Sequence, residues 1–252
     1  MEGGLSISPG AIVAKANNPL WVKREVEPLR ERTLKTLRDA ILSNHLKPGQ
    51  RLVERDLCEQ AGVSRSSIRE ALRYLESEGL IESHGSKGMF VSVLNRKQAL
   101  EIYEVRAALE SEAARHFVER ATDAELKSIR RAYESAERLL SGDADALSRE
   151  IDRFFEILFT GARNGTAFSL LRMVRARINL LRHATTRAAS SERLKGSMAQ
   201  MKLIVEALER REAGAAAEAC RRYVARSADF AARFLEEQER ASKKAERVAG
   251  VR

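Results

Sequence analysis

Cysteine, proline and aromatic residues are scarce in this sequence. Its 252 residues include two cysteines and four prolines, and aromatic residues make up 5% of the chain. Cys58 and Cys220 lie far apart, each inside an apparent helix and without a CxxC partner. This spacing indicates neither a thiolate metal site nor a disulfide framework, so we expect two inert, buried thiols.

Long apolar runs, targeting signals and catalytic motifs are also missing. No apolar run approaches the roughly eighteen residues that cross a bilayer, and the N-terminus lacks a charged, then apolar, then small-residue signal. We therefore expect a cytoplasmic protein without membrane contact. The sequence shows no nucleophile paired with a base, no paired carboxylates, no phosphate-binding glycine loop and no metal centre, so an enzyme is not predicted.

Charge, by contrast, is abundant and has a basic excess. The chain carries 45 Lys and Arg against 36 Asp and Glu, a net charge of +9. Such an excess favours a polyanionic partner, for example a nucleic acid. Residues 1–94 hold 14 basic and 12 acidic residues, so charge alone does not locate the partner on the chain.

The first part of the chain divides into an arm and a small helical module. Residues 1–28 mix Gly, Pro, Asn and Ser without a sustained period, which predicts a flexible arm. Apolar spacing predicts a helix over 29–43 and a short helix over 52–62. Ser64 is placed to cap a third helix, which closes at Gly79.

The segment after the third helix predicts strands. The stretch "LIESHGSKGMFVSV", residues 80–93, alternates β-favouring runs around two glycines, which is typical of a β-hairpin. Three helices followed by a hairpin, with a tight turn before the third helix, are the layout of a winged helix-turn-helix domain. We assign that domain to residues 29–94.

From residue 95 onward the pattern predicts helices alone. Turn-forming stretches near residues 121, 141, 162, 188 and 211 separate six helices of roughly 16 to 26 residues, with Ser191 as the cap of the fifth. We expect these helices to form an antiparallel bundle over 95–240, followed by a charged, fraying tail over 241–252. The predicted fold class is therefore mainly α.

Dense motifs connect both parts of the chain to a known family. The stretches "LRDAIL", "KPGQRLVERDL", "GVSRSSIREALRYLESEGLI" and "GMFV" make residues 28–94 resemble the winged-helix domain of the GntR family of bacterial transcription regulators. The bundle, headed by "EVRAALESEAARHFVERAT", resembles the all-helical FCD effector domain of the family's FadR branch, with Arg106, Glu110 and Asn164 as anchors. The resemblance implies a homodimer that binds double-stranded DNA at an inverted repeat and responds to a small-molecule effector.

The third helix carries arginines at positions 65, 69 and 73. In this fold the N-terminal turn of that helix enters the major groove, where arginine can bind guanine with two hydrogen bonds. The DNA contacts that the resemblance implies are Arg55, Ser64, Arg65, Ser66, Ser67, Arg69, His84 and Gly85. We expect Arg55 and Arg65 to read bases, Arg69 and the serines to hold phosphates, and His84 to enter the minor groove. Arg73 lies too far along the helix, and we predict a surface position for it.

The family's metal site is altered here. Most relatives with the FCD domain bind a metal through an Asp, a His four residues later and two further histidines. The resemblance places these positions in this chain at Ile151, Phe155, Met201 and Tyr223. None of the four is a normal ligand for a hard metal, so we predict no metal and no other cofactor.

Two alternatives remain for the altered site. In the first, the four residues only fill the core of a dimerisation scaffold. In the second, they line a pocket for a small organic anion, with Arg175 and Asn179, or Arg172 and Arg175, supplying polar contacts. We favour a regulator whose DNA affinity is changed by such an effector. A metal-responsive regulator of the same family and a nonspecific DNA-binding protein are the competing hypotheses, and the sequence does not distinguish repression from activation.

Overall fold

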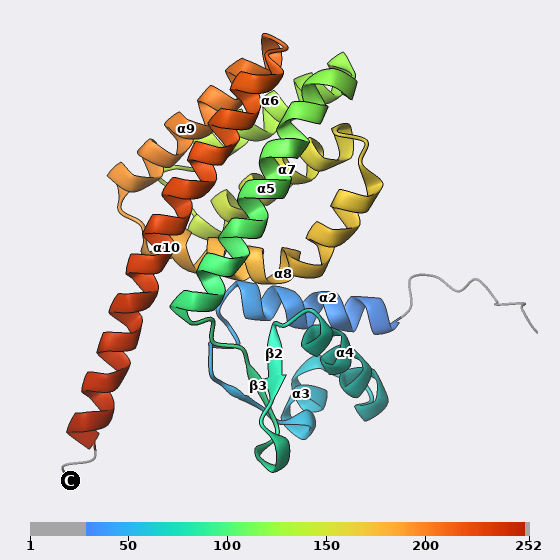
Figure 1. Ribbon diagram of the computed structural model, residues 1–252. Coiled ribbons are helices and arrows are strands. Elements are labelled where there is room, and N and C mark those ends of the chain that lie inside the picture. Colours follow the sequence, from blue (N-terminus) through green and yellow to red (C-terminus); the bar gives the residue numbers. More distant parts are fainter. Residues whose placement is uncertain (1–28, 250–252) are drawn as a thin grey trace, which may run out of the picture.

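The structure, a computed structural model, describes residues 29–249, except for the side chains of residues 172, 173 and 242–249. The predicted arm over 1–28 and the last three residues lie outside the described part. Figure 1 shows two parts, a small module with a sheet and a larger bundle of helices above it. This arrangement confirms the predicted fold class.

The small module is a winged helix-turn-helix domain. Its elements are α2 (Leu29–Leu42), β1 (Arg51–Leu52), α3 (Glu54–Ala61), α4 (Arg65–Ser77), β2 (Ile81–Ser83), the 3₁₀ turn η1 (Gly85–Lys87) and β3 (Met89–Val91). The three strands form an antiparallel sheet in the order β1-β3-β2, with Leu52 opposite Met89 and Ile81 opposite Val91. Helix α4 packs against α2 and β2, and its Ile68, Leu72 and Leu75 are all buried as their spacing predicts.

The second helix of the module is shorter than predicted. The sequence favours helix from residue 52, whereas Leu52 belongs to β1 and α3 begins at Glu54. The reason is that Arg51 and Leu52 add a third strand to the hairpin, which buries the Leu52 side chain to 6% exposure. The helix ends as expected at Gly62, whose φ of 65° is a left-handed conformation that glycine adopts without strain.

The larger part is an antiparallel bundle of six helices. They are α5 (Arg96–Arg120), α6 (Asp123–Arg138), α7 (Ala144–Gly161), α8 (Gly165–Ala188), α9 (Ser191–Glu209) and α10 (Ala213–Ala249). Between residues 95 and 249 the described chain contains no strand, as predicted. Side-chain caps set the helix starts, including capping boxes at Asn95 and Thr122. The cap of α9 is Ser190, one residue before the predicted Ser191.

Helix α10 differs most from the prediction. It is 37 residues long, packs along α5 and α9, and stays helical to Ala249, where the sequence predicts fraying. Figure 1 shows its C-terminal half extending past the bundle beside the winged domain. No helix within residues 29–249 combines the length and apolar character needed to cross a membrane.

The two cysteines occupy different environments. Cys220 is buried in the bundle, and burial raises the pKa of its thiol well above the usual range, which makes it unreactive. Cys58 is half-buried against the core of the winged domain, so the prediction of a buried thiol is correct for Cys220 only. Both thiols are free.

Candidate DNA-binding surface and core cavity

The N-terminal turn of α4 is a compact polar surface. Ser64 caps the helix by accepting a hydrogen bond from the backbone N–H of Ser67. The Ser64 hydroxyl also lies 2.8 Å from that of Ser66 and 3.0 Å from that of Ser67. The cap therefore groups the three predicted phosphate-binding serines around the start of the helix, where backbone N–H groups favour an anion.

The three arginines of α4 have different surroundings. Arg65 is exposed at the first helical position, and its side chain has no ion pair or hydrogen bond with another described residue. Arg69 is held by Glu54 of α3, with its Nε 2.8 Å from the carboxylate. Arg73 is exposed further along the helix, as predicted. Arg65 is thus the arginine of this row that is free to reach a base.

The remaining predicted DNA contacts lie on α3 and on the loop between β2 and β3. The Arg55 side chain is 72% exposed, and among the described residues it forms ion pairs only with neighbours on its own helix, Asp56 at 3.3 Å and Glu59 at 4.0 Å. His84 is half exposed, lies 2.9 Å from Glu82 and packs its ring against Phe90 at 4.8 Å. These contacts fix the base of the loop, which turns at Gly85.

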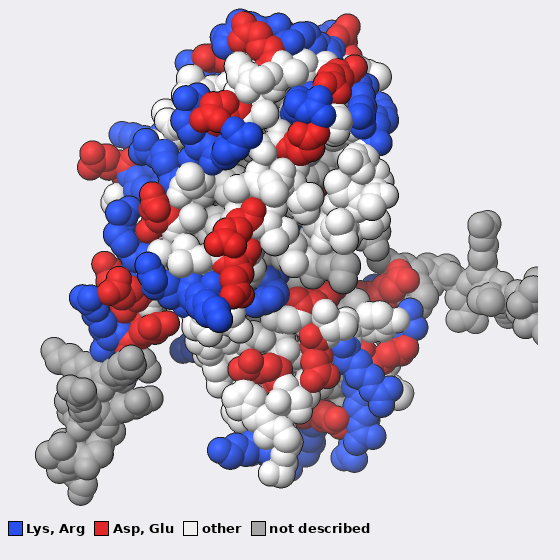
Figure 2. All heavy atoms as spheres, viewed as in Figure 1, with Lys and Arg blue, Asp and Glu red and all other residues white. Residues whose placement is uncertain are grey.

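These residues lie at one end of the molecule. Figure 2 shows Lys and Arg side chains at the end that carries α3, α4 and the β2–β3 loop, interspersed with acidic and uncharged residues. Two exposed basic residues there, Arg51 and Lys87, are absent from the sequence prediction. A Cβ placed on Gly88 would lie 3.6 Å from Arg51 Nε, so Arg51 lies against the base of the loop. Lys87 could have been found from its charge in the hairpin loop, whereas Arg51 joins this surface only because β1 pairs with β3.

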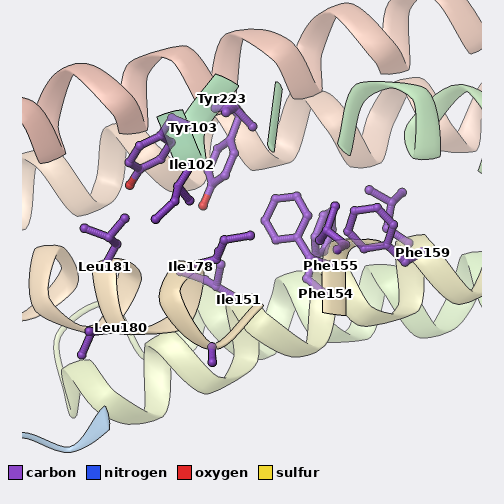
Figure 3. Close-up of a cluster of buried hydrophobic side chains, with 14 of the residues drawn as sticks. Ile102, Tyr103, Ile151, Phe154, Phe155, Phe159, Ile178, Leu180, Leu181 and Tyr223 are labelled. Carbon is purple, nitrogen blue, oxygen red and sulfur yellow. The ribbon is translucent and has the colours of Figure 1, made fainter. Parts of the chain in front are cut away.

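The four altered metal positions are buried in the bundle. Ile151, Phe155, Met201 and Tyr223 are each exposed by 4% or less. The rings of Phe155 and Tyr223 contact each other at a tilt, with their centroids 5.5 Å apart. Figure 3 shows Tyr223 pointing across the bundle toward Ile151, and Tyr103 pointing toward Leu181. Within the described residues, no group of three or more His, Cys, Asp or Glu side chains is arranged to hold a metal ion. The prediction of a metal-free protein stays a prediction.

A cavity of about 40 Å³, here called the core cavity, lies beside two of these positions, Ile151 and Tyr223. Its lining contains three arginines and no acidic residue. The polar lining residues are Tyr103, Arg106, Arg182, Thr185, Thr186, Arg193, Ser197, Tyr223 and Ser227. A small hollow whose polar side chains are all cationic or hydroxyl-bearing is suited to an anion.

Two of the three arginines are fully buried and ion-paired. Arg106, 2% exposed, donates to both carboxylate oxygens of Glu110, at 2.7 and 3.2 Å. Burial disfavours its charged form, but Glu110, together with Tyr103 and Tyr223, raises the pKa of Arg106 above its ordinary value. Arg182, 7% exposed, pairs with Asp152. Both guanidinium groups also stack on the ring of Phe155, at 5.8 and 5.2 Å from its centroid.

Arg182 and Arg193 are less well compensated than Arg106. Burial and the positive charge of Arg106 lower the pKa of Arg182. Burial, followed by the charges of Arg226 and Arg233, lowers the pKa of Arg193. Arg193 forms no ion pair with a described acidic residue; it donates to the Arg226 carbonyl and lies over the Phe230 ring. Because arginine stays protonated in proteins, these cations would be stabilised by an anion in the cavity.

The structure separates the predicted pocket residues into two groups. Ile151 and Tyr223 line the core cavity, while Phe155, Arg175 and Asn179 line a second cavity of about 30 Å³. Arg175 pairs with Glu156 at 2.8 Å, and Met201 lines neither cavity. Sequence reasoning missed Arg182 and Arg193 as lining residues. The sequence shows several arginines in α8, but their spacing does not indicate which of them face inward.

Comparisons with known proteins agree with both halves of the structure. The family model "Bacterial regulatory proteins, gntR family" matches residues 29–91, and the FCD domain model matches residues 101–226. The chain is 33% identical over 148 residues to the HTH-type transcriptional regulator YdhC of Bacillus subtilis (strain 168), a match that covers 58% of this chain and 66% of that protein. It is 33% identical over 176 residues to the HTH-type transcriptional regulator Rv0494 of Mycobacterium tuberculosis (strain ATCC 25618 / H37Rv), covering 63% and 72% of the two chains.

The first three curated relatives are matched over 66%, 42% and 51% of their own lengths, so the chain spans less than two thirds of each. Among solved structures, E. coli McbR/YncC superposes with a TM-score of 0.71 at 22% identity, over 85% of this chain and all of that one. At that identity the likeness shows the fold. The relatives are transcriptional regulators rather than enzymes. The chain belongs to the GntR family of bacterial transcription regulators and joins the family's winged helix-turn-helix domain to an FCD domain.

Proposed function

We propose that this GntR-family regulator binds a short inverted-repeat DNA operator as a homodimer, and that a small organic anion in the core cavity changes its affinity for that DNA. Arg55 and Arg65 read bases, while Ser64, Ser66, Ser67 and Arg69 hold phosphates. His84 and Gly85 of the wing enter the minor groove. A two-fold axis duplicates this surface, so the operator has two equivalent half-sites.

The DNA part is supported by Arg65, which is exposed at the start of α4 and forms no ion pair with any residue that the structure describes. The test is selection from a random DNA pool, followed by native mass spectrometry of the complex. We expect an enriched inverted repeat and two protein chains per DNA duplex. A nonspecific DNA-binding protein would enrich no sequence, and a single chain per duplex would contradict the dimer.

The effector part is carried by one observation: three arginines and no carboxylate line the core cavity. One buried water needs roughly 10–15 Å³ of such volume, so a cavity of about 40 Å³ holds only a few non-hydrogen atoms. This size suits the carboxylate or phosphate group of a ligand. The predicted pocket residues Ile151 and Tyr223 supply the apolar wall and a hydroxyl of this site.

Thermal unfolding in acetate or inorganic phosphate, compared with chloride at equal ionic strength, tests the effector site. Binding to the folded state alone raises stability by about 2.7 kcal/mol at a hundredfold excess over Kd, so we expect a clear rise in Tm. Arg193→Met should lose that rise. Arg222→Met removes an equal charge from the exposed face of α10 and should keep it. An equal Tm in all three salts, or an equal response of both variants, would contradict the site.

The competing hypothesis is a metal-responsive regulator of the same family. It requires ligands at positions that hold Ile151, Phe155, Met201 and Tyr223. Native mass spectrometry of the purified protein separates the two hypotheses. A stoichiometric metal ion would overturn the organic-anion proposal.

A further inference from the structure

Helix α8 touches both the core cavity and the winged domain. At its C-terminal end, Arg187 donates from NH1 to the carbonyl of Leu42, the last residue of α2, at 2.8 Å. Helix α2 is the first helix of the winged domain and packs on α4, the helix that carries Arg65. A displacement of Arg187 can therefore be passed to α4 through α2 alone.

A chain of charged contacts links the core cavity to Arg187. Arg182, which lines the cavity, pairs with Asp152 of α7. Asp152 Oδ2 lies 3.5 Å from His183 Nε2, and His183 Nδ1 lies 3.2 Å from Asp145 Oδ1. That same oxygen of Asp145 lies 2.5 Å from Arg187 NH1. The contacts are consecutive, and His183 stands between the two carboxylates: in its neutral form it donates to one of them, and in its protonated form to both.

We propose that these five residues couple anion occupancy of the core cavity to the contact between α8 and α2, an inference that rests on the proposed function. Arg182 is the shared group, because it faces the cavity and also neutralises Asp152. An anion in the cavity competes with Asp152 for the Arg182 guanidinium. Asp152 and Asp145 are then left with less positive charge around them.

The consequence falls on Arg187. Its NH1 is shared between the Asp145 carboxylate and the Leu42 carbonyl. When the negative charge of Asp145 and Asp152 is less compensated, Arg187 is drawn toward the carboxylates, since a charge-assisted hydrogen bond is about twice as strong as one to a neutral carbonyl. The bond to Leu42 weakens, and the last turn of α2 loosens. A ligand shifts an equilibrium only through such a difference between two states.

A cleft already separates the two parts where this change would act. The cleft measures about 1140 Å³ and is lined by Leu42 and Ser43 of the winged domain and by Asp145, Asp152 and His183 of the bundle. Helix α8 has a second contact with the winged domain, at Arg177. This side chain lies against Gly79 at the end of α4, and a Cβ placed on Gly79 would come within 2.9 Å of Arg177 Cδ. Arg177 forms no ion pair or hydrogen bond with a described residue, so it is outside the charged chain.

Hydrogen exchange at the end of α2 tests the coupling without knowledge of the operator. The reporters are the amides of Ser43, Asn44 and Leu46, which donate to carbonyls of the last turns of α2. Inorganic phosphate is the probe. Allosteric coupling commonly amounts to about 5- to 150-fold, so we expect phosphate to speed exchange at these amides at least about 5-fold in the wild-type protein.

Arg187→Gln should reduce this response to less than about 2-fold, while phosphate still raises its Tm as in the wild type. Asp145→Asn provides a second break in the chain if the first variant folds poorly. The matched control is Arg175→Gln, which removes another ion pair between α7 and α8, that with Glu156. The control should respond like the wild type.

The outcomes separate the two proposals. A wild-type protein whose Tm is unchanged by phosphate overturns the effector site and this coupling with it. A wild-type protein that binds phosphate but shows no change at the α2 amides overturns the coupling alone. The coupling is also overturned if Arg187→Gln and Asp145→Asn keep the full response, or if Arg175→Gln loses it equally.

Discussion

The winged domain and the bundle use arginine in opposite ways. Arg55 and Arg65 of the winged domain are exposed, with at most surface ion pairs to neighbouring carboxylates. Arg106 and Arg182 of the bundle are 2% and 7% exposed, and each is held by a buried or nearly buried carboxylate. An exposed arginine can be given to DNA at little cost to folding, whereas a buried one needs a counter-charge. This difference supports the proposed DNA-binding role of the first group and the proposed anion site beside the second.

The largest effect is expected where a buried pair is broken. Glu110→Gln leaves Arg106 buried without its counter-charge, because Glu110 is itself 1% exposed and accepts both hydrogen bonds. Removing one partner of such a pair destabilises by about 3–5 kcal/mol. Urea unfolding monitored by circular dichroism measures the loss.

The paired replacement Arg106→Met with Glu110→Leu is the control, since a buried ion pair can be exchanged for apolar residues with little loss of stability. We expect it to unfold within about 1 kcal/mol of the wild type. If Glu110→Gln also stayed within that range, the charge of Glu110 would not be what keeps Arg106 in the core.

In the winged domain we expect a smaller effect, which changes the affinity for DNA and leaves the stability of the fold unchanged. Arg65→Ala should weaken binding to the selected operator by about 1–3 kcal/mol and relax the preference at one base pair per half-site. The free energy of unfolding should stay within about 0.5 kcal/mol, because the side chain is exposed and unpaired. Fluorescence anisotropy with the operator and with single-base variants measures the first effect, and urea unfolding the second.

Arg73→Ala is the matched control on the same helix, two turns away. It should leave operator affinity and base preference as they are in the wild type. If Arg65→Ala and Arg73→Ala lost the same operator affinity, α4 would contribute only positive charge to DNA binding. The distinction between base-reading and surface arginines would then be wrong.

The winged domain could be predicted from the sequence because its signals are local. Ser64 as a cap, Gly62 and Gly79 as helix ends, and the alternation around Gly85 each act over a few residues, and the structure contains all of them. The missed strand β1 has only two residues, too few to show a period. Its existence depends on pairing with β3, almost forty residues later in the chain.

The bundle core could be predicted only in part. The helix limits could be predicted from local caps. The inward face of α8 could not, because in a helix with many arginines the polar and apolar faces differ little. Arg182 faces inward because Asp152 of α7 and the Phe155 ring receive it. These partners belong to another helix, and a single sequence does not show which helix faces meet.

The smallest expected effect is on the pH dependence of stability, and it compares His183 of the bundle with His84 of the winged domain. Burial, aided by the positive charges of Arg182 and Arg187, lowers the pKa of His183 below 6.5, although its hydrogen bond to Asp145 opposes the shift. Between that lowered pKa and 6.5 the unfolded chain binds more protons than the folded one. The folded state is therefore at its most stable with respect to His183 above pH 6.5, and it loses stability as the pH falls through this window.

Replacing His183 by Asn should flatten the decline in stability between about pH 7 and pH 5. One group changes stability by at most about 1.4 kcal/mol per pH unit, so the difference between the two slopes is small. Urea unfolding at a series of pH values measures it. His84→Asn changes the exposed histidine of the wing and should keep the wild-type slope. The opposite result would be a flatter dependence of stability on pH for His84→Asn and an unchanged one for His183→Asn. The pH dependence would then arise in the winged domain, and His183 would not contribute to it.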